Sequence, residues 1–124
     1  MKYYTEDHLW VEVNGDEVIV GISEYMADEL GDVEYVDLPG EDDDFIIGDR
    51  LGVLRAACGK LDLYSPISGT VSQINESLYD EPTLINDSPE EKGWLFHLCD
   101  FDDEELDDMM QEDAYLRYLD KNFR

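Results

Sequence analysis

The chain has 124 residues, of which 33 are acidic and 8 are basic, and the formal net charge of −25 excludes a nucleic-acid binder that works by neutralising phosphates. Its length fits one domain over residues 1–124 with a modest core. No apolar run approaches the length of a membrane span and the N-terminal stretch lacks the pattern of a secretory signal, so the sequence predicts a cytoplasmic protein.

The first third of the chain predicts a hairpin and a short helix. Two runs of alternating or β-branched residues are joined through Asn14 to Asp16, a signal typical of hairpins. Ser23 suits a helix N-cap and Gly31 suits a helix stop. The segment VEYVDLPG then alternates apolar and acidic residues, so we expect Val33 and Tyr35 to face inward.

From residue 45 onward, short apolar runs alternate with turn residues. The arms LGVLRAA and LDLY predict a hairpin that ends at Cys58-Gly59-Lys60, and the runs TVSQI and GWLFHL predict two more strands around an irregular segment, 75–89. Close spacing of short strands indicates a mainly β fold, a sandwich or barrel with short helices. We expect the core to include Trp10, Trp94, Tyr35 and Phe96.

The C-terminal stretch predicts an amphipathic helix. Apolar residues recur at helical spacing from Leu106 to Leu119, acidic residues come early, and basic residues come late. This order of charges complements the helix dipole. We therefore expect one terminal helix to lie against the sheet.

Motifs for chemistry are scarce in this sequence. The acidic runs Glu41 to Asp44 and Asp100 to Asp108 lack the spacing of a calcium loop, so we interpret them as solvated surface and predict no metal site. His8 and His97 have no metal-ligand or catalytic pattern beside them. No nucleophile motif or phosphate-binding glycine pattern is present. The sequence therefore predicts a protein that is not an enzyme.

Two residues at the predicted hairpin tip have functional interpretations. Lys60 suits attachment of a long acyl cofactor, because a flexible tether raises the effective concentration of its cargo at partner sites. The alternative is an ordinary surface lysine. Cys58 lies at the same tip; with Cys99 it is expected to keep a free thiol rather than form a disulfide.

Several stretches resemble, in order, the landmarks of the glycine cleavage system H protein family. They are YTEDHLWVEV, GISEYMADELGDVEYVDLPG, GDRLGV, LYSPISGTVSQINESLYDEPTLIN, GWLF and the closing EELDDMM and AYLRYL. The resemblance implies a lipoyl-domain-like barrel-sandwich hybrid with a C-terminal helix. It also implies a covalent lipoate arm that shuttles an aminomethyl group between glycine decarboxylase and aminomethyltransferase. Dihydrolipoyl dehydrogenase and a lipoate attachment enzyme are the further implied partners.

The sequence departs from the family at the tip. The family pattern resembles ESVKAASDIYSPVSG, and an ungapped comparison puts Cys58 at the position of the modified lysine, Arg55 at that of the glutamate, and Lys60 two residues late. Gly59 leaves open a rebuilt turn with Lys60 at its tip. Three hypotheses follow: a carrier lipoylated at Lys60, a non-lipoylated adaptor or regulator, and a protein that works through the Cys58 thiol. Oligomeric state stays open, and salt adaptation and docking on basic partners explain the acidity equally well.

Overall fold

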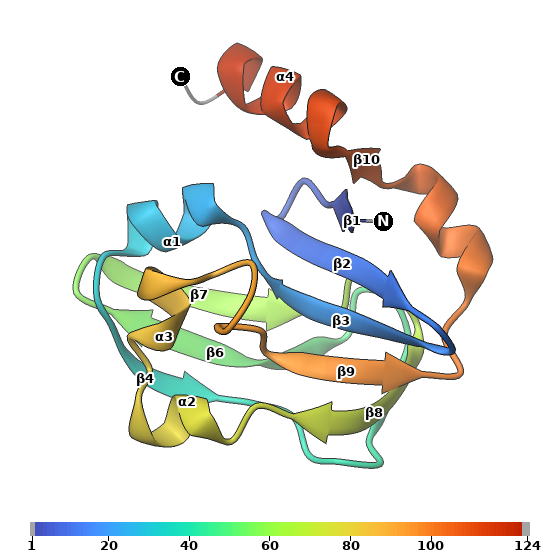
Figure 1. Cartoon of the computed structure of the whole chain (residues 1–124), viewed down its shortest axis with the longest axis horizontal. Coiled ribbons are helices and arrows are strands. Elements are labelled where there is room, and N and C mark those ends of the chain that lie inside the picture. Colours follow the sequence, from blue (N-terminus) through green and yellow to red (C-terminus); the bar gives the residue numbers. More distant parts are fainter. Residues whose placement is uncertain (1, 123–124) are drawn as a thin grey trace.

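The computed structural model of the chain describes residues 2–122 and contains two β-sheets with short helices around them (Figure 1). The larger sheet has the strand order β10-β1-β2-β3-β9-β8-β5 and the smaller sheet the order β4-β6-β7. The strands are β1 (Lys2–Tyr4), β2 (Leu9–Asn14), β3 (Glu17–Ile22), β4 (Val33–Asp37), β5 (Asp44–Phe45), β6 (Arg50–Ala56), β7 (Gly59–Tyr64), β8 (Gly69–Ile74), β9 (Phe96–Cys99) and β10 (Met110–Gln111). The helices are α1 (Glu24–Leu30), α2 (Ser77–Asp80), α3 (Leu84–Asp87), a 3₁₀ helix (Asp103–Asp108) and α4 (Glu112–Asn122).

The main core lies between the two sheets. Alternation along each strand sends one set of side chains inward, because successive residues of a strand point to opposite faces. Strands β2 and β3 contribute Val11, Val18 and Val20, and the smaller sheet contributes Leu54 and Leu63, all buried. The predicted hairpin between β2 and β3 is confirmed, with Asn14 opposite Glu17 across its turn.

Three of the four aromatic side chains expected in the core are at least partly buried. Trp10 and Phe96 are fully buried and Trp94 is half-buried. The expectation for Tyr35 was wrong, because 53% of this residue is exposed. An irregularity in the β4–β6 register between Val33 and Tyr35 adds a residue and turns the tyrosine outward.

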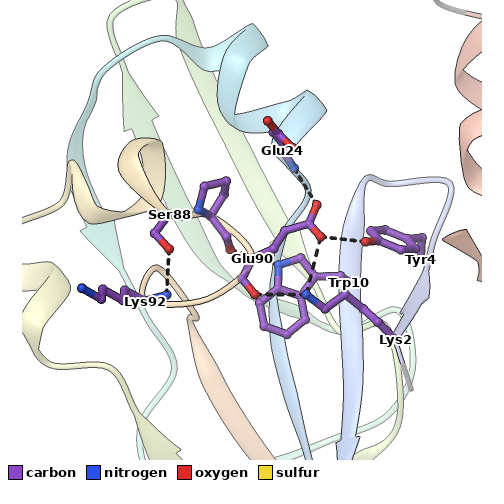
Figure 2. Close-up of polar contacts among 8 residues, drawn as sticks. Lys2, Tyr4, Trp10, Glu24, Ser88, Glu90 and Lys92 are labelled. Atoms are coloured by element: carbon purple, nitrogen blue, oxygen red, sulfur yellow. Dashed lines mark hydrogen bonds and ion pairs between the residues drawn. The ribbon is translucent and has the colours of Figure 1, made fainter.

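Helix α1 is fastened at its start by side chains from elsewhere in the chain. Ser23 caps the helix by accepting a hydrogen bond from the Met26 amide at 3.3 Å. The Glu90 carboxylate accepts bonds from the Glu24 amide at 3.0 Å and from the Tyr4 hydroxyl at 2.6 Å (Figure 2). Lys2 Nζ donates to the Glu90 carbonyl at 3.0 Å. The loop after α3 thereby joins the N-terminal strand to α1.

The C-terminal segment is not the single helix that the periodicity predicts. A 3₁₀ helix ends before Met109, which is extended, and Met110–Gln111 pair with Tyr3 and Tyr4 of β1. Helix α4 begins only at Glu112. Tyr115 and Leu119 of this helix are buried against Tyr4 and Trp10 in a second apolar cluster. Pairing with β1 therefore interrupts a helical pattern that is continuous in the sequence.

The segment 75–89 is also more regular than expected. It contains the two short helices α2 and α3, with Leu78 and Ile85 fully buried. Helix α2 lies beside β4 and α3 contacts α1 (Figure 1). No helix within residues 2–122 combines the length and the apolar character that a membrane crossing requires.

Candidate functional site around the β6–β7 hairpin

The hairpin of β6 and β7 forms one end of the molecule, beside α1 (Figure 1). Its last cross-strand pair is Ala56 with Gly59, so the two residues of the turn are Ala57 and Cys58. The expected tip at residues 58–60 is therefore displaced toward the N-terminus. Lys60 lies on β7, directly opposite Arg55, and the structure contains no rebuilt turn with Lys60 at its apex. Gly59 opens the strand with a φ of 145°, a conformation that favours glycine.

The turn is bonded to the end of α1. The Cys58 amide donates to the Leu30 carbonyl at 2.9 Å, and the Ala57 amide donates to the Asp32 carbonyl at 3.0 Å. The first of these bonds satisfies a carbonyl in the last turn of the helix, where partners within the helix are lacking. Both turn amides thus donate to carbonyls of the same chain. Contacts with a partner at the turn would therefore have to come from its side chains.

Asn86 of α3 holds the segment to which the turn is bonded. Its Nδ2 donates to the Gly31 carbonyl at 2.7 Å and to the Ala27 carbonyl at 3.4 Å, while its Oδ1 accepts from the Val33 amide at 2.8 Å. One amide side chain therefore fixes the chain between α1 and β4. The hairpin turn, the end of α1 and α3 form a continuous hydrogen-bonded support.

The Lys60 side chain projects into solvent from this support. Its exposed fraction is 61%, and Nζ lies 4.0 Å from Asp62 Oδ1, which also receives a 3.4 Å contact from Arg50. An ion pair at this distance between exposed groups contributes little free energy. Lys60 also lines a groove of about 340 Å³ with Glu6, Asp7 and others. The amine is therefore accessible, although it lies two residues, or ~7 Å, along the strand from Cys58.

The two cysteines lie in different surroundings. Cys58 is exposed in the turn and lies beside Gly31, whose φ is 73°. A Cβ atom added to Gly31 would lie 3.1 Å from the Cys58 Sγ. Cys99 is half-buried on β9, and burial raises the pKa of its thiol. Both carry free thiols. The thiol at the surface of the hairpin is thus Cys58.

A row of three exposed side chains crosses the outer face of the smaller sheet. The strand registers place Tyr35 opposite Arg55 and Arg55 opposite Lys60. The Arg55 guanidinium carbon lies 6.0 Å from the centre of the Tyr35 ring. Sequence reasoning missed this row because Tyr35 was assigned to the core. It also missed Asn86, whose partners are more than 50 residues away in the sequence.

Of the two histidines, His8 lines the groove beside Lys60, whereas His97 lies on β9. His8 is buried, with Nδ1 at 2.8 Å from the Tyr115 hydroxyl, and His97 Nδ1 lies 3.1 Å from Glu17 Oε1. The nearby Ser72 hydroxyl and the contact with His97 lower the pKa of Glu17. Within residues 2–122, no three His, Cys, Asp or Glu side chains are grouped so that they could hold a metal ion.

Two facing sheets with a projecting hairpin and a C-terminal helix define a lipoyl-domain-like barrel-sandwich fold. A crystal structure of a glycine cleavage system H protein from Mycobacterium marinum superposes with a TM-score of 0.84 at 27% identity, covering 94% of each chain. The family profile named Glycine cleavage H-protein matches residues 2–122.

Curated relatives give the same assignment. The glycine cleavage system H protein of Staphylococcus carnosus is 41% identical over 112 residues, covering 90% of this chain and 89% of the relative. A probable glycine cleavage system H protein from Haloarcula marismortui is 43% identical over 112 residues, covering 90% and 88%. The chain belongs to the glycine cleavage H-protein family, whose members are carrier components that in general carry lipoate.

Proposed function

We propose that this chain, as one carrier domain over residues 1–124, shuttles an aminomethyl group in the cytoplasmic glycine cleavage system on a lipoyl arm attached to Lys60. Its partners are glycine decarboxylase, aminomethyltransferase, dihydrolipoyl dehydrogenase and a lipoate attachment enzyme. The observation that carries the proposal is an accessible amine on a hairpin whose turn is bonded to α1, in a chain of this family.

The residues around Lys60 fit an acyl arm. The side chain extends from a strand rather than a loose loop, and its nearest anionic partner is an exposed carboxylate at 4.0 Å. The deprotonated amine attacks the carbonyl of an activated lipoyl ester or adenylate, an amide bond forms, and the activating group and one proton leave. When bound, lipoate supplies a disulfide that is reduced as it accepts the aminomethyl carbon. The chain itself supplies the position of the arm.

A non-lipoylated adaptor is the second candidate, and one observation favours it. The turn residue at the position of the family's modified lysine is Cys58, while Lys60 lies farther along β7. An attachment enzyme that requires its lysine in the turn would leave this chain unmodified. The chain would then keep the fold and the partner-binding surfaces without the arm. In the third hypothesis, the exposed Cys58 thiol itself would react in place of a lipoyl arm.

Intact-mass measurement after co-expression with a lipoate attachment enzyme tests the proposal. We expect a mass increase of one lipoyl group in the wild type, loss of that increase in Lys60→Arg, and its retention in Lys92→Arg and Cys58→Ser. An unmodified wild type, under conditions that lipoylate another member of the family, would support the adaptor. Loss of partner-dependent activity in Cys58→Ser, with no lipoyl mass in any variant, would support thiol chemistry.

A further inference from the structure

We infer that the exposed face formed by Tyr35, Arg55 and Lys60, called here the β4–β6–β7 row, docks on a carboxylate of the protein partner that acylates this chain. The inference rests on the proposed function for the identity of that partner, the lipoate attachment enzyme. The partner's surface is basic where it meets the acidic remainder of the chain, and it carries an Asp or Glu side chain at the position that meets Arg55. Three independent features of the hairpin support this assignment.

The first feature is the distribution of charge. The hairpin, residues 50–64, holds three of the chain's eight basic residues but only one of its 33 acidic residues. The hairpin segment therefore has a positive formal charge, whereas exposed Glu34 and Asp37 flank Tyr35 on the neighbouring strand β4. Because the Debye length is about 8 Å at physiological ionic strength, a partner in contact with the hairpin responds to the local charge more than to the distant negative field.

The second feature is the surroundings of Arg55. No Asp or Glu within residues 2–122 lies at ion-pair distance from its guanidinium, although carboxylates abound in the chain. Instead, its central carbon lies 6.0 Å from the centre of the Tyr35 ring. By contrast, Arg50 and Lys60 share the Asp62 carboxylate. The tyrosine orients the guanidinium while its hydrogen-bond donors stay available for a planar acceptor.

The third feature is the register between Arg55 and Lys60. The two residues are directly opposite each other on β6 and β7, so an enzyme that covers Lys60 also covers Arg55. Removing an arginine from water without an acceptor is costly, and within residues 2–122 no carboxylate lies at ion-pair distance from Arg55. An enzyme that binds this face must provide one. A carboxylate accepts two parallel hydrogen bonds from a guanidinium and matches it in charge.

The two charge patterns have separate roles in docking. The acidic remainder of the chain attracts a basic partner surface and raises the association rate. It also repels nucleic acid, which excludes a polyanion as the occupant of the row. The single carboxylate opposite Arg55 then sets the orientation in which the partner reaches Lys60. An acidic chain can therefore bind a partner that presents a single carboxylate to Arg55.

Binding to the lipoate attachment enzyme of the same genome tests the inference. The measurements use the Lys60→Arg background, in which residue 60 cannot be acylated, and titration calorimetry at 50 and 200 mM salt. We expect Arg55→Glu to weaken binding at least tenfold, Arg55→Gln to weaken it several-fold, and Tyr35→Ala to weaken it less. The matched control is Arg117→Glu on α4, which makes the same charge change far from the hairpin in sequence and should alter binding less than twofold.

A cross-linking readout identifies the acceptor. In the Lys60→Arg background, Arg55→Lys places an amine at residue 55, and carbodiimide should couple it to an Asp or Glu of the enzyme. Equal weakening by Arg55→Glu and Arg117→Glu, no weakening by either, or no binding of the wild type would each overturn the inference. Selective weakening by Arg55→Glu without a lipoyl mass on the wild type would uphold the docking face and overturn lipoylation of Lys60.

Discussion

The α4 end of the molecule and the β6–β7 end place the same kinds of side chain in opposite surroundings. Around α4, Tyr115 is buried, stacks on Tyr4 with ring centres 4.6 Å apart, and has the Ser23 hydroxyl at 2.7 Å. At the hairpin, Tyr35 is exposed beside an arginine that has no carboxylate partner within residues 2–122. Aromatic and polar side chains at the α4 end stabilise the fold, whereas those at the β6–β7 end are available to contact a partner protein.

The pKa values at the α4 end reflect this burial. Burial raises the pKa of Tyr115 to about 12, and burial with the Glu90 hydrogen bond raises the pKa of Tyr4 well above its ordinary value of 10.0. Burial also lowers the pKa of His8 below its usual 6.5. All three groups are therefore neutral at pH 7. The Tyr115 hydroxyl contacts His8 and Ser23, and these neutral groups join α4 to the residues that flank β2 and β3.

Tyr115→Ala should produce the largest change in stability. The substitution removes a buried aromatic ring that packs on Tyr4, and changes of this kind cost about 3–5 kcal/mol. Tyr115→Phe keeps the ring but leaves His8 and Ser23 without their shared partner, at a cost of about 1–3 kcal/mol. Urea unfolding followed by circular dichroism measures both values. A loss of less than 1 kcal/mol for the alanine variant would contradict the role of this cluster.

Asn86→Ala should have a smaller effect on stability and a local effect on the hairpin. Loss of the bonds to the Gly31 carbonyl and the Val33 amide costs about 1–2 kcal/mol. Because these bonds hold the segment that carries the turn, the Ala57 and Cys58 amides should exchange faster with deuterium. The amide of Val11 in the main sheet is the internal control. Unchanged exchange at the turn would show that α1 supports the hairpin without Asn86.

Stability should fall as pH decreases through the range in which His8 titrates. The unfolded chain binds a proton on this histidine near pH 6.5, whereas the folded chain binds it only at lower pH because burial opposes the charge and outweighs the attraction of Asp7 and Glu29. The contribution of neutral His8 to the free energy of unfolding is therefore fully present above pH 6.5. It is lost as the pH falls through the lower pKa that His8 has in the folded state.

His8→Asn removes the titrating group at this position. Asparagine tolerates the left-handed φ of 68° at residue 8 and does not titrate, so the urea midpoint of the variant should vary less with pH. Comparison of the two proteins between pH 8 and pH 5 isolates the histidine from the many carboxylates. Parallel curves would show that another group causes the pH dependence.

Tyr35→Ala and Lys60→Arg should change the free energy of unfolding least, by less than about 0.5 kcal/mol, because both side chains project from the surface. The same urea unfolding measurement applies. A loss above 1 kcal/mol for Tyr35→Ala would mean that the tyrosine supports the sheet, and the contrast between the two ends of the molecule would then fail.

Features set by neighbouring residues could be predicted from the sequence. The turn after Asn14, the cap at Ser23 and the end of α1 near Gly31 are each determined within a few residues, and each occurs where expected. The order of family motifs also led to the correct family. These features gave the mainly β fold and pointed to the β6–β7 hairpin.

Features set by distant residues were missed or misplaced. The helical pattern before α4 is interrupted because Met110 pairs with Tyr4, more than 100 residues away. Tyr35 faces outward because of an irregular register with β6, which alternation alone does not reveal. The turn falls on Ala57 and Cys58, whose amides bond to the end of α1. In each instance a contact distant in sequence overrides the local pattern.

The bonds from Cys58 to Leu30 of α1 and from Ala57 to Asp32 just after it have a consequence for how any cargo would move. A hairpin whose turn is anchored in this way does not swing as a hinge, so travel between enzymes would have to come from rotation about side-chain bonds. The pivot would stay at a constant place on the body. Each enzyme would then meet the cargo within the volume that the rotating side chain can reach. On docking, only that side chain and its cargo would lose conformational entropy.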